Sequence, residues 1–442
     1  MQVSHKNNLV YVFYEYIFYI FVFLLPWQTV WILREIFYGN EKWQYGTIGI
    51  YVSDIFIIIW LALGFILYKK QIHAFIQNHK RLIILISLFI TWIYLSIIWS
   101  SDKTLALYYA IKISIAFDLF LFVQIVPVNL RAVSIVFVSS AFLQSIIGLY
   151  QFLSQKTFSQ KFLGLQSHNV WQGGNSIVST DSERWLRIYG GMPHPNIFGV
   201  LLLTALLLSI YLLITNKHKK VLNLFLLLSI SLFTTNILLT FSRTIWLTSA
   251  LSTATITLFL FINNKPDFKK IILPTLLIIF NIILIVSCYS FLFNSRITND
   301  TKPTHNSVTD RVFYITQAKK MIKTHPIIGT GIGNYTKTAF ENDLKKLPLW
   351  HYQPVHNIFY LTTAETGLVG LVFFLLFLIY IFYNFFYHQN KTFYKSTLFT
   401  IFVSFLFISF FDHWLITSHF GTLLFFLMSG LLLTKQKGTQ TI

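Results

Sequence analysis

The chain is 442 residues long, and 55% of its residues are hydrophobic while only 11% are charged. Soluble domains carry about 25% charged residues, so this composition excludes a soluble protein and predicts an integral membrane protein. The formal net charge of +19 does not indicate a nucleic-acid partner, because much of it falls in short patches between apolar runs, where it acts as a topology signal. Membrane lipids with anionic headgroups are the expected partners of these patches.

Apolar runs follow one another along the chain, each close to the roughly 20 residues that a spanning helix needs. They cover residues 10–32, 50–68, 82–99, 104–126, 132–153, 197–215, 221–239, 244–262, 271–293, 357–384, 396–411 and 416–434. The predicted fold is therefore all-α, a polytopic membrane protein with about twelve transmembrane helices. Lys112 and Asp118 lie within the fourth run, and we expect them to pair or to face a cavity, since isolated charges are costly in a membrane. Asp54 and Glu365 are open to the same interpretations.

Short lysine-rich patches separate these runs. They are Lys69-Lys70 with Lys80-Arg81, Lys217 with Lys219-Lys220, Lys265 with Lys269-Lys270, Lys391 with Lys395, and Lys435 with Lys437. With this number of spans, every patch falls on the same side as both termini, so the positive-inside rule places both termini in the cytoplasm. The prediction is a multi-pass protein of the cytoplasmic (inner) membrane, with residues 294–356 as one long extracytoplasmic helical loop.

The loop 294–356 is the longest polar interval of the chain, and connections of that length usually carry function. Asp310 is the expected N-cap of a helix from Arg311 to about Thr324. Arg311 would then lie in the first turn, where the helix dipole favours anions. The glycine-rich segment 329–333 is interpreted as a helix-ending turn, because no strand precedes it and no Lys-Ser/Thr pair follows it, as a phosphate-binding loop requires.

Four stretches at the predicted outer face carry arginine and histidine. They are 187–196, with Arg187, His194 and Asn196; 240–243, which ends in Arg243; Arg311 with its helix; and His356-Asn357. Arginine offers a planar fork that matches phosphate oxygens, and histidine exchanges protons near neutral pH. Simpler roles stay open: the arginines could anchor span ends in lipid headgroups, 194–196 could be a turn and helix cap, and His356 could be an interfacial histidine.

The order of these motifs resembles a known family. Arg187 and His194-Pro195-Asn196 are followed by Thr240-Phe241-Ser242-Arg243, Asp310-Arg311, His325-Pro326-Ile327-Ile328-Gly329-Thr330-Gly331, His356-Asn357-Ile358-Phe359-Tyr360-Leu361 and Asp412-His413-Trp414. Over roughly residues 185–430 this looks like the O-antigen ligase and O-antigen polymerase superfamily. The resemblance divides the chain into transmembrane helices one to five with an extracytoplasmic loop (1–184), a ligase-like transmembrane domain that includes the loop 294–356 (185–434), and a cytoplasmic tail (435–442).

Members of that family are similar to metal-independent, inverting, GT-C-like glycosyltransferases that need no cofactor. The resemblance implies a glycan donor linked to undecaprenyl diphosphate at the outer face of the membrane, and as acceptor lipid A-core or another surface glycan or lipid. It implies that Arg187 and Arg311 hold the diphosphate with the help of Arg243, and that His356 activates the acceptor hydroxyl or orients the acceptor and the leaving group. His194, Asn196, Asn357, Asp412 and His413 are secondary candidates.

Three other functions are considered, one within the family and two outside it. A surface-polysaccharide polymerase shares these motifs, so the sequence does not separate it from a ligase. A secondary transporter also has about twelve spans and intramembrane charge. Against a transporter, no duplicated half is visible and the candidate residues gather at one face. A third alternative, a structural scaffold for envelope assembly, is less consistent with the order of the arginine and histidine motifs along the chain.

Overall fold

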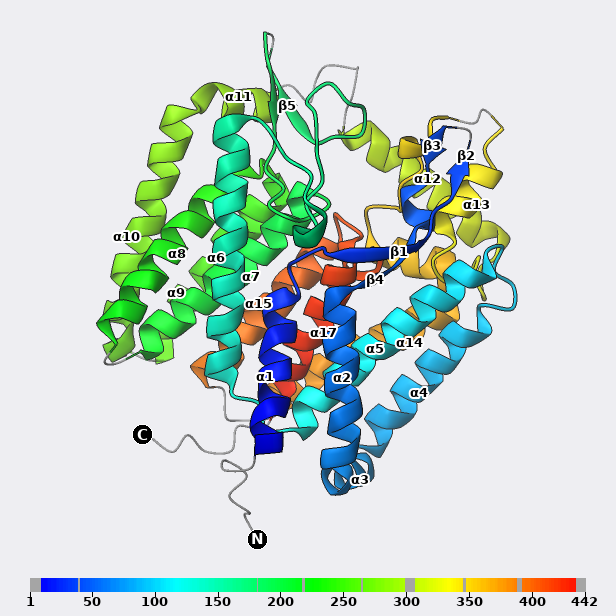
Figure 1. Ribbon diagram of the computed structural model, residues 1–442, viewed down its shortest axis with the longest axis horizontal. Helices are drawn as coiled ribbons and strands as arrows, with labels where there is room; N and C mark the ends of the chain where they lie inside the picture. Colours follow the sequence, from blue (N-terminus) through cyan, green and yellow to red (C-terminus); the bar gives the residue numbers. More distant parts are fainter. Residues whose placement is uncertain are drawn as a thin grey trace.

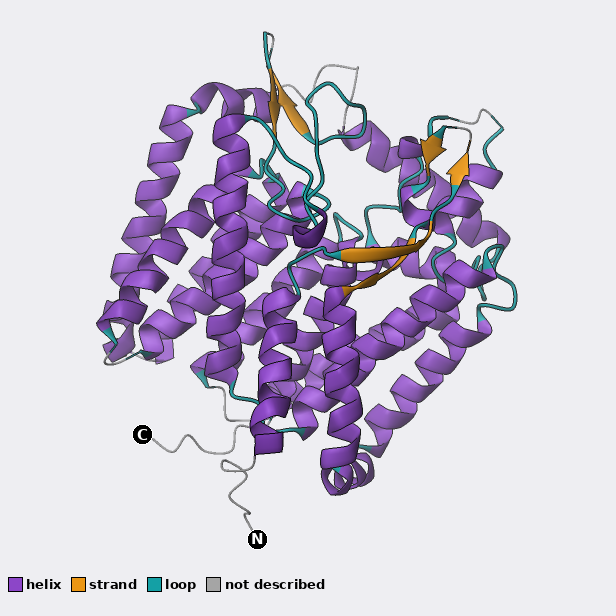
Figure 2. Cartoon of the chain, viewed as in Figure 1, coloured by secondary structure: helices purple, strands orange, loops and turns teal. Residues whose placement is uncertain are grey.

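The computed structural model describes residues 9–38, 40–180, 182–216, 219–263, 265–298, 307–344, 347–387 and 392–434. The predicted tail 435–442 and Lys217 and Lys391 of the basic patches lie outside these residues. The described chain is predominantly helical with a few short strands (Figure 2), so the prediction of an all-α fold is confirmed.

Each of the predicted spans overlaps one long helix of the described chain. These helices are α1 (Leu9–Leu24), α2 (Val52–Leu67), α4 (Lys80–Leu95), α5 (Lys103–Ile125), α6 (Leu130–Ser154), α7 (Pro195–Thr215), α8 (Lys220–Leu239), α9 (Arg243–Asn263), α10 (Lys265–Cys288), α14 (Ile358–Tyr387), α15 (Phe393–Ser409) and α17 (His419–Leu433). The alternation of apolar runs and polar breaks therefore located the helices well.

Not all of these helices qualify as membrane spans. Among the described residues, seven helices are long and apolar enough to cross a membrane, and eight if α2 and α3 (Lys69–Asn78), which bend by 88° at their junction, count as one. The predicted number of about twelve is therefore not confirmed. The first run, 10–32, was predicted too long: α1 ends at Leu24, because Pro26 cannot continue a helix.

Helix α7 lies at the centre of the bundle. Of its most apolar stretch, 89% is buried inside the protein, whereas only 17% of the corresponding stretch of α10 is buried. Helices α6, α8, α9 and α15 pack around α7, and a second group is built on the close packing of α5 against α17 and of α1 against α2. Helix α10 therefore presents most of its surface outward, as a lipid-facing helix does.

The short strands and extra helices gather at one end of the bundle, and α3 lies at the other (Figure 1). Strand β1 (Val30–Arg34) pairs with β4 (Ile48–Tyr51), β2 (Phe37–Tyr38) with β3 (Glu41–Lys42), and β5 (Ile177–Ser179) with β6 (Arg184–Leu186), all antiparallel. The helices at this end are α11 (Ser290–Thr298), α12 (Ser307–Thr324) and α13 (Tyr335–Glu341). We call it the loop end.

The long loop differs from the prediction at the start of its helix. Helix α12 begins at Ser307, so Asp310 lies within its first turn and is not the N-cap, and Arg311 follows that turn. Helix α12 ends at Thr324, just before Pro326 and the glycines, as expected. The loop then docks on a break in α14, where Gly367 has φ +69° and ψ −175°: Gly331 N donates a hydrogen bond of 2.8 Å to Glu365 O, and Leu368 N one of 2.9 Å to Pro326 O. The glycine-rich segment is thus a structural turn.

Candidate functional site

Arg187 follows β6 at the loop end and turns back into the protein, where it is only 6% exposed. Its Nε donates a hydrogen bond of 2.6 Å to Thr240 O, and its Nη2 donates one of 2.9 Å to Asn196 Oδ1. The guanidinium therefore joins the hairpin β5–β6, the turn before α9 and the start of α7. A side chain that is hydrogen-bonded through two of its three nitrogens keeps one orientation, unlike a mobile arginine in the lipid headgroup region.

The start of α7 supplies the next part of the site. Pro195 occupies the first helical position, where its missing N–H costs nothing, and His194 is the N-cap, with Nδ1 accepting from Asn196 N at 3.1 Å. The other ring nitrogen of His194 lies 3.0 Å from Ser176 Oγ. Asn196 Nδ2 donates a hydrogen bond of 2.8 Å to Asp412 Oδ2. Asn196 thus connects Arg187 with Asp412 through its two amide atoms.

A further arginine lies in this cluster and was missed by the sequence analysis. Arg296 in α11 donates from Nε to Phe241 O at 3.1 Å, next to the carbonyl of Thr240 that receives Arg187. Phe241 has φ +48°, a backbone conformation uncommon for a bulky residue, and this turn presents both carbonyls to the two arginines. Arg296 follows the predicted span 271–293 closely, and Arg187 and Arg243 likewise lie close to predicted spans. Unlike them, Arg296 belongs to no motif that the sequence made visible.

The electrostatics of this cluster favour an anion. Burial, followed by the positive charges of Arg296 and Arg243, lowers the pKa of Arg187 to about 9, so Arg187 is still protonated at neutral pH. Burial alone would raise the pKa of Asp412, but His413, His356 and His194 and the hydrogen bond from Asn196 together hold it below its ordinary value. Arg187 thus lies near two further guanidinium groups and one carboxylate, which leaves an excess of positive charge.

His356 lies next to this cluster, between two other rings. It stacks on Tyr314 of α12, with ring centroids 5.4 Å apart, and meets the ring of His413 edge to face at 4.9 Å. His413 Nδ1 lies 2.6 Å from Thr417 Oγ1. The Nδ1 atom of His356 is buried and has no hydrogen-bond partner among the described residues. A ring that is held by packing while one nitrogen stays unpaired is available to exchange a proton.

The histidines of the site are neutral at physiological pH. Burial, followed by the charges near His413 and Arg311, lowers the pKa of His356 to about 3. Burial, followed by the charge of Arg187, lowers the pKa of His194 to about 3, and burial also lowers the pKa of His413. A neutral imidazole has a lone pair that can accept a proton, which is the protonation state of a general base, although the lowered pKa makes His356 a weaker base than a free histidine.

The remaining candidates take different places. Arg311, half-buried on α12, is close enough for its charge to act on His356. Asn357 caps α14, because its Oδ1 accepts hydrogen bonds of 3.0 and 3.1 Å from Phe359 N and Tyr360 N; nothing in this geometry points to a chemical role. The structure thus brings together nine residues from six segments of the chain: Arg187 with His194 and Asn196, then Arg243, Arg296, Arg311, His356, and Asp412 with His413.

In the part of the chain that the structure describes, no group of three or more His, Cys, Asp or Glu is placed to hold a metal ion.

Residues 225–375 match the family model described as O-antigen ligase. The matched part runs from α8 to the middle of α14 and includes the turn at 240–243, α11, α12 and His356. The family resemblance of the motifs is thereby confirmed. No curated protein matches the sequence.

Proposed function

We propose that this chain, whose residues 225–375 match the O-antigen ligase family model, transfers a glycan from a polyprenyl-diphosphate donor to a glycan or lipid acceptor. The observation that carries the proposal is the continuous cluster from Arg187 through Asn196, Asp412 and His413 to His356. It joins a cationic site to a neutral, unpaired imidazole.

The arginines are suited to the donor's diphosphate. Arg187, Arg243 and Arg296 surround one turn, and Arg311 approaches from α12 beside His356. The diphosphate is the leaving group, so its negative charge grows as the glycosidic bond breaks. Fixed guanidinium groups stabilise that charge more in the transition state than in the ground state, which accelerates the reaction.

His356 is suited to the acceptor. In the proposed step the acceptor hydroxyl gives its proton to the neutral imidazole, and the acceptor oxygen forms a bond to the anomeric carbon. The bond from that carbon to the diphosphate oxygen breaks, and the electron pair leaves on the diphosphate. Attack opposite the leaving group inverts the anomeric configuration. Tyr314 and His413 would hold the imidazole ring in place for this transfer.

The proposed location is the cytoplasmic membrane, with the loop end on the extracytoplasmic side. This is supported by the position of α3, which starts with Lys69-Lys70 and lies at the end of the bundle opposite the site (Figure 1). Lysine-rich connections favour the cytoplasmic face. The same orientation keeps the proposed division of the chain, with 185–434 forming the transferase domain and both termini in the cytoplasm.

The test is a transfer assay in proteoliposomes that contain an undecaprenyl-diphosphate-linked glycan and a lipid or oligosaccharide acceptor. We expect the glycan to move to the acceptor, and the product length separates the two branches of the family: one addition per acceptor indicates a ligase, whereas a ladder of repeats indicates a polymerase. The parallel measurement is the dissipation of solute and proton gradients in the same vesicles. Gradient dissipation without glycan transfer over a range of donors would replace the proposal with a transporter.

A further inference from the structure

A cavity of about 220 Å³ lies beside the cluster and is not used by the proposed chemistry. Its walls come from the β1–β4 hairpin, α5, the start of α17 and the loop 190–193. It shares two walls with the candidate site: Gly190–Pro193 lead directly to His194, and Thr417, which contacts His413, lines the cavity. A molecule in the cavity would therefore lie next to the groups that carry out transfer.

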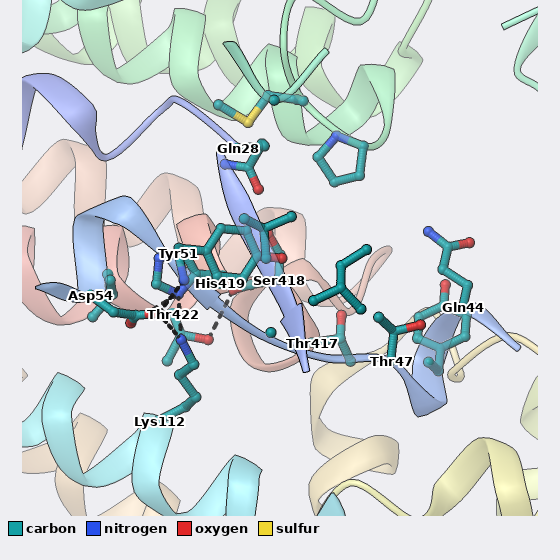
Figure 3. Close-up of a pocket in the computed structure, with 18 of the residues that line it drawn as sticks. Gln28, Gln44, Thr47, Tyr51, Asp54, Lys112, Thr417, Ser418, His419 and Thr422 are labelled. Carbon is teal, nitrogen blue, oxygen red and sulfur yellow. Dashed lines mark hydrogen bonds and ion pairs between the residues drawn. The ribbon is translucent and has the colours of Figure 1, made fainter. Parts of the chain in front are cut away.

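The floor of the cavity is a buried polar cluster of α2, α5 and α17 (Figure 3). Lys112 Nζ pairs with Asp54 Oδ2, which also accepts from Tyr51 N at 2.8 Å. Lys112 further lies 3.4 Å from His419 Nδ1 and 5.1 Å from the centre of the Tyr51 ring. The carboxylate of Asp54 thus compensates the positive charge of the ammonium group.

Two polar atoms on the cavity walls lack partners among the described residues. Asp54 is 3% exposed, and its Oδ1 accepts no hydrogen bond, since His419 Nδ1 lies 3.7 Å away. Gln28 Nε2, a donor of another residue that lines the cavity, is also buried and has no partner among the described residues. Buried polar groups are costly unless they are hydrogen-bonded. The cavity wall therefore holds one unpaired acceptor and one unpaired donor among the described residues.

We infer that this cavity binds one uncharged sugar residue of a glycan substrate, through a hydroxyl that donates to Asp54 Oδ1 and a hydroxyl or ring oxygen that accepts from Gln28 Nε2. A sugar supplies both kinds of group on one small ring. The volume lies below the roughly 300–1,000 Å³ of pockets for drug-sized ligands, which suits a single sugar ring. Tyr45, Tyr108 and Tyr109 offer apolar surface to its C–H faces.

The charge of the lining argues for an uncharged sugar. The lysines that line the cavity are Lys42 and Lys112, and each is paired with a carboxylate, Glu35 for the first and Asp54 for the second. A uronic acid would bring a carboxylate next to Asp54 without a free cation to receive it. The inference rests on the proposed function for the identity of the glycan but not for the binding itself.

The first test measures binding without catalysis, by saturation-transfer NMR on the whole protein in nanodiscs. The probes are the methyl glycosides of glucose, galactose, N-acetylglucosamine and glucuronic acid. Gln28→Met removes the unpaired donor at nearly constant size and breaks no side-chain hydrogen bond of Gln28 to the described residues. Gln77→Met, on the exposed surface of α3, is the matched control. We expect at least one uncharged glycoside to bind the wild type and the control, and binding to Gln28→Met to be about 3- to 10-fold weaker.

A second test identifies which substrate supplies the sugar. In the transfer assay, Gln28→Met should raise one KM about 3- to 10-fold. The KM for the acceptor rises if the cavity holds a sugar of the acceptor, and the KM for the donor rises if it holds a sugar of the donor. Probe binding that is equal in wild type and Gln28→Met, together with unchanged KM for both substrates, would overturn the inference. Gln28-dependent binding in a wild type that transfers no glycan would support the cavity and reject the proposed function, so the two failures are distinguishable.

Discussion

Asn196 Nδ2 donates a 2.8 Å hydrogen bond to Asp412 Oδ2 across 216 positions of sequence. Through this bond the start of α7 is tied to the turn after α15, and Arg187 is tied to both through Asn196 Oδ1. The assignment of the amide follows from the network, because only this orientation gives the guanidinium an acceptor and the carboxylate a donor. The two halves of the candidate site are held together at this residue.

Replacing Asn196 tests this connection. Asn196→Leu removes one acceptor from Arg187 and one donor from Asp412, and leaving buried polar groups unpaired costs about 1–3 kcal/mol each. We expect a lower thermal midpoint in nanodiscs and a loss of glycan transfer larger than the loss of folded protein explains. Asn175→Leu, in the loop before β5, is the comparison for a lost side-chain hydrogen bond outside this connection. An Asn196→Leu variant with wild-type stability and rate would show that the connection has no role.

The buried pair of Asp54 and Lys112 predicts a non-additive pattern of stability. Asp54→Asn leaves Lys112 without its counter-charge, and Lys112→Met leaves Asp54 without its own, so each single change should cost about 3 kcal/mol or more. The double variant removes both charges and should unfold closer to the wild type than either single variant does. Unfolding is measured by denaturant titration in mixed micelles. Costs that simply add would mean that the two charges do not interact.

The break in α14 predicts a strong effect of one methyl group. Gly367 has φ +69°, and a Cβ placed on it would lie 1.9 Å from Ile327 O. Gly367→Ala should therefore lower the free energy of unfolding by more than about 1 kcal/mol and loosen the loop that docks there. Gly173→Ala is the matched control, because the nearest atom to its added Cβ is 3.8 Å away. Equal stability of the two variants would contradict the docking of the loop on α14.

Burial of His413 predicts a dependence of stability on pH. Because its folded pKa lies below its ordinary value of 6.5, the unfolded chain binds more protons than the folded chain between these two values. Stability therefore rises with pH in that interval and falls as pH drops below 6.5, by up to about 1.4 kcal/mol per pH unit for one group. The thermal midpoint of wild type should fall between pH 7.5 and 5.5 more than that of His413→Gln. An equal fall in the two proteins would contradict this account, and His325→Gln, at an exposed histidine, should behave as wild type.

Several features of the fold could be predicted from the sequence, and others could not for physical reasons. Apolar runs located the long helices, because a helix in a membrane must be apolar along its length. The hairpins at the loop end were missed, since strands of two to five residues are too short for a periodic pattern. Lys112 was expected to pair with Asp118 or to face a cavity. It faces a cavity and pairs with Asp54, because residues six apart do not share a helix face.

The candidate site was predictable in its residue types but not in its connections. Arginines and histidines at span ends were visible as motifs, and the structure places Arg187, Arg311 and His356 in one cluster. No local pattern could show that Asn196 meets Asp412, because contacts over such separations depend on the packing of whole helices. Arg296 was missed for the same reason: only the folded turn at Phe241 brings it beside Arg187.

The most direct test of the central claim is glycan transfer in proteoliposomes by His356→Ala and Arg311→Ala, with and without EDTA. His325→Ala and Lys320→Ala, at an exposed histidine and an exposed lysine of the same loop, are the matched controls. The account predicts a loss of at least about 100-fold for His356→Ala, the lower range for a general base, and a clear loss for Arg311→Ala. It also predicts activity close to wild type for both controls and no effect of EDTA. Full transfer by both site variants, at equal expression and folding, would contradict the assignment of this cluster as the transfer site.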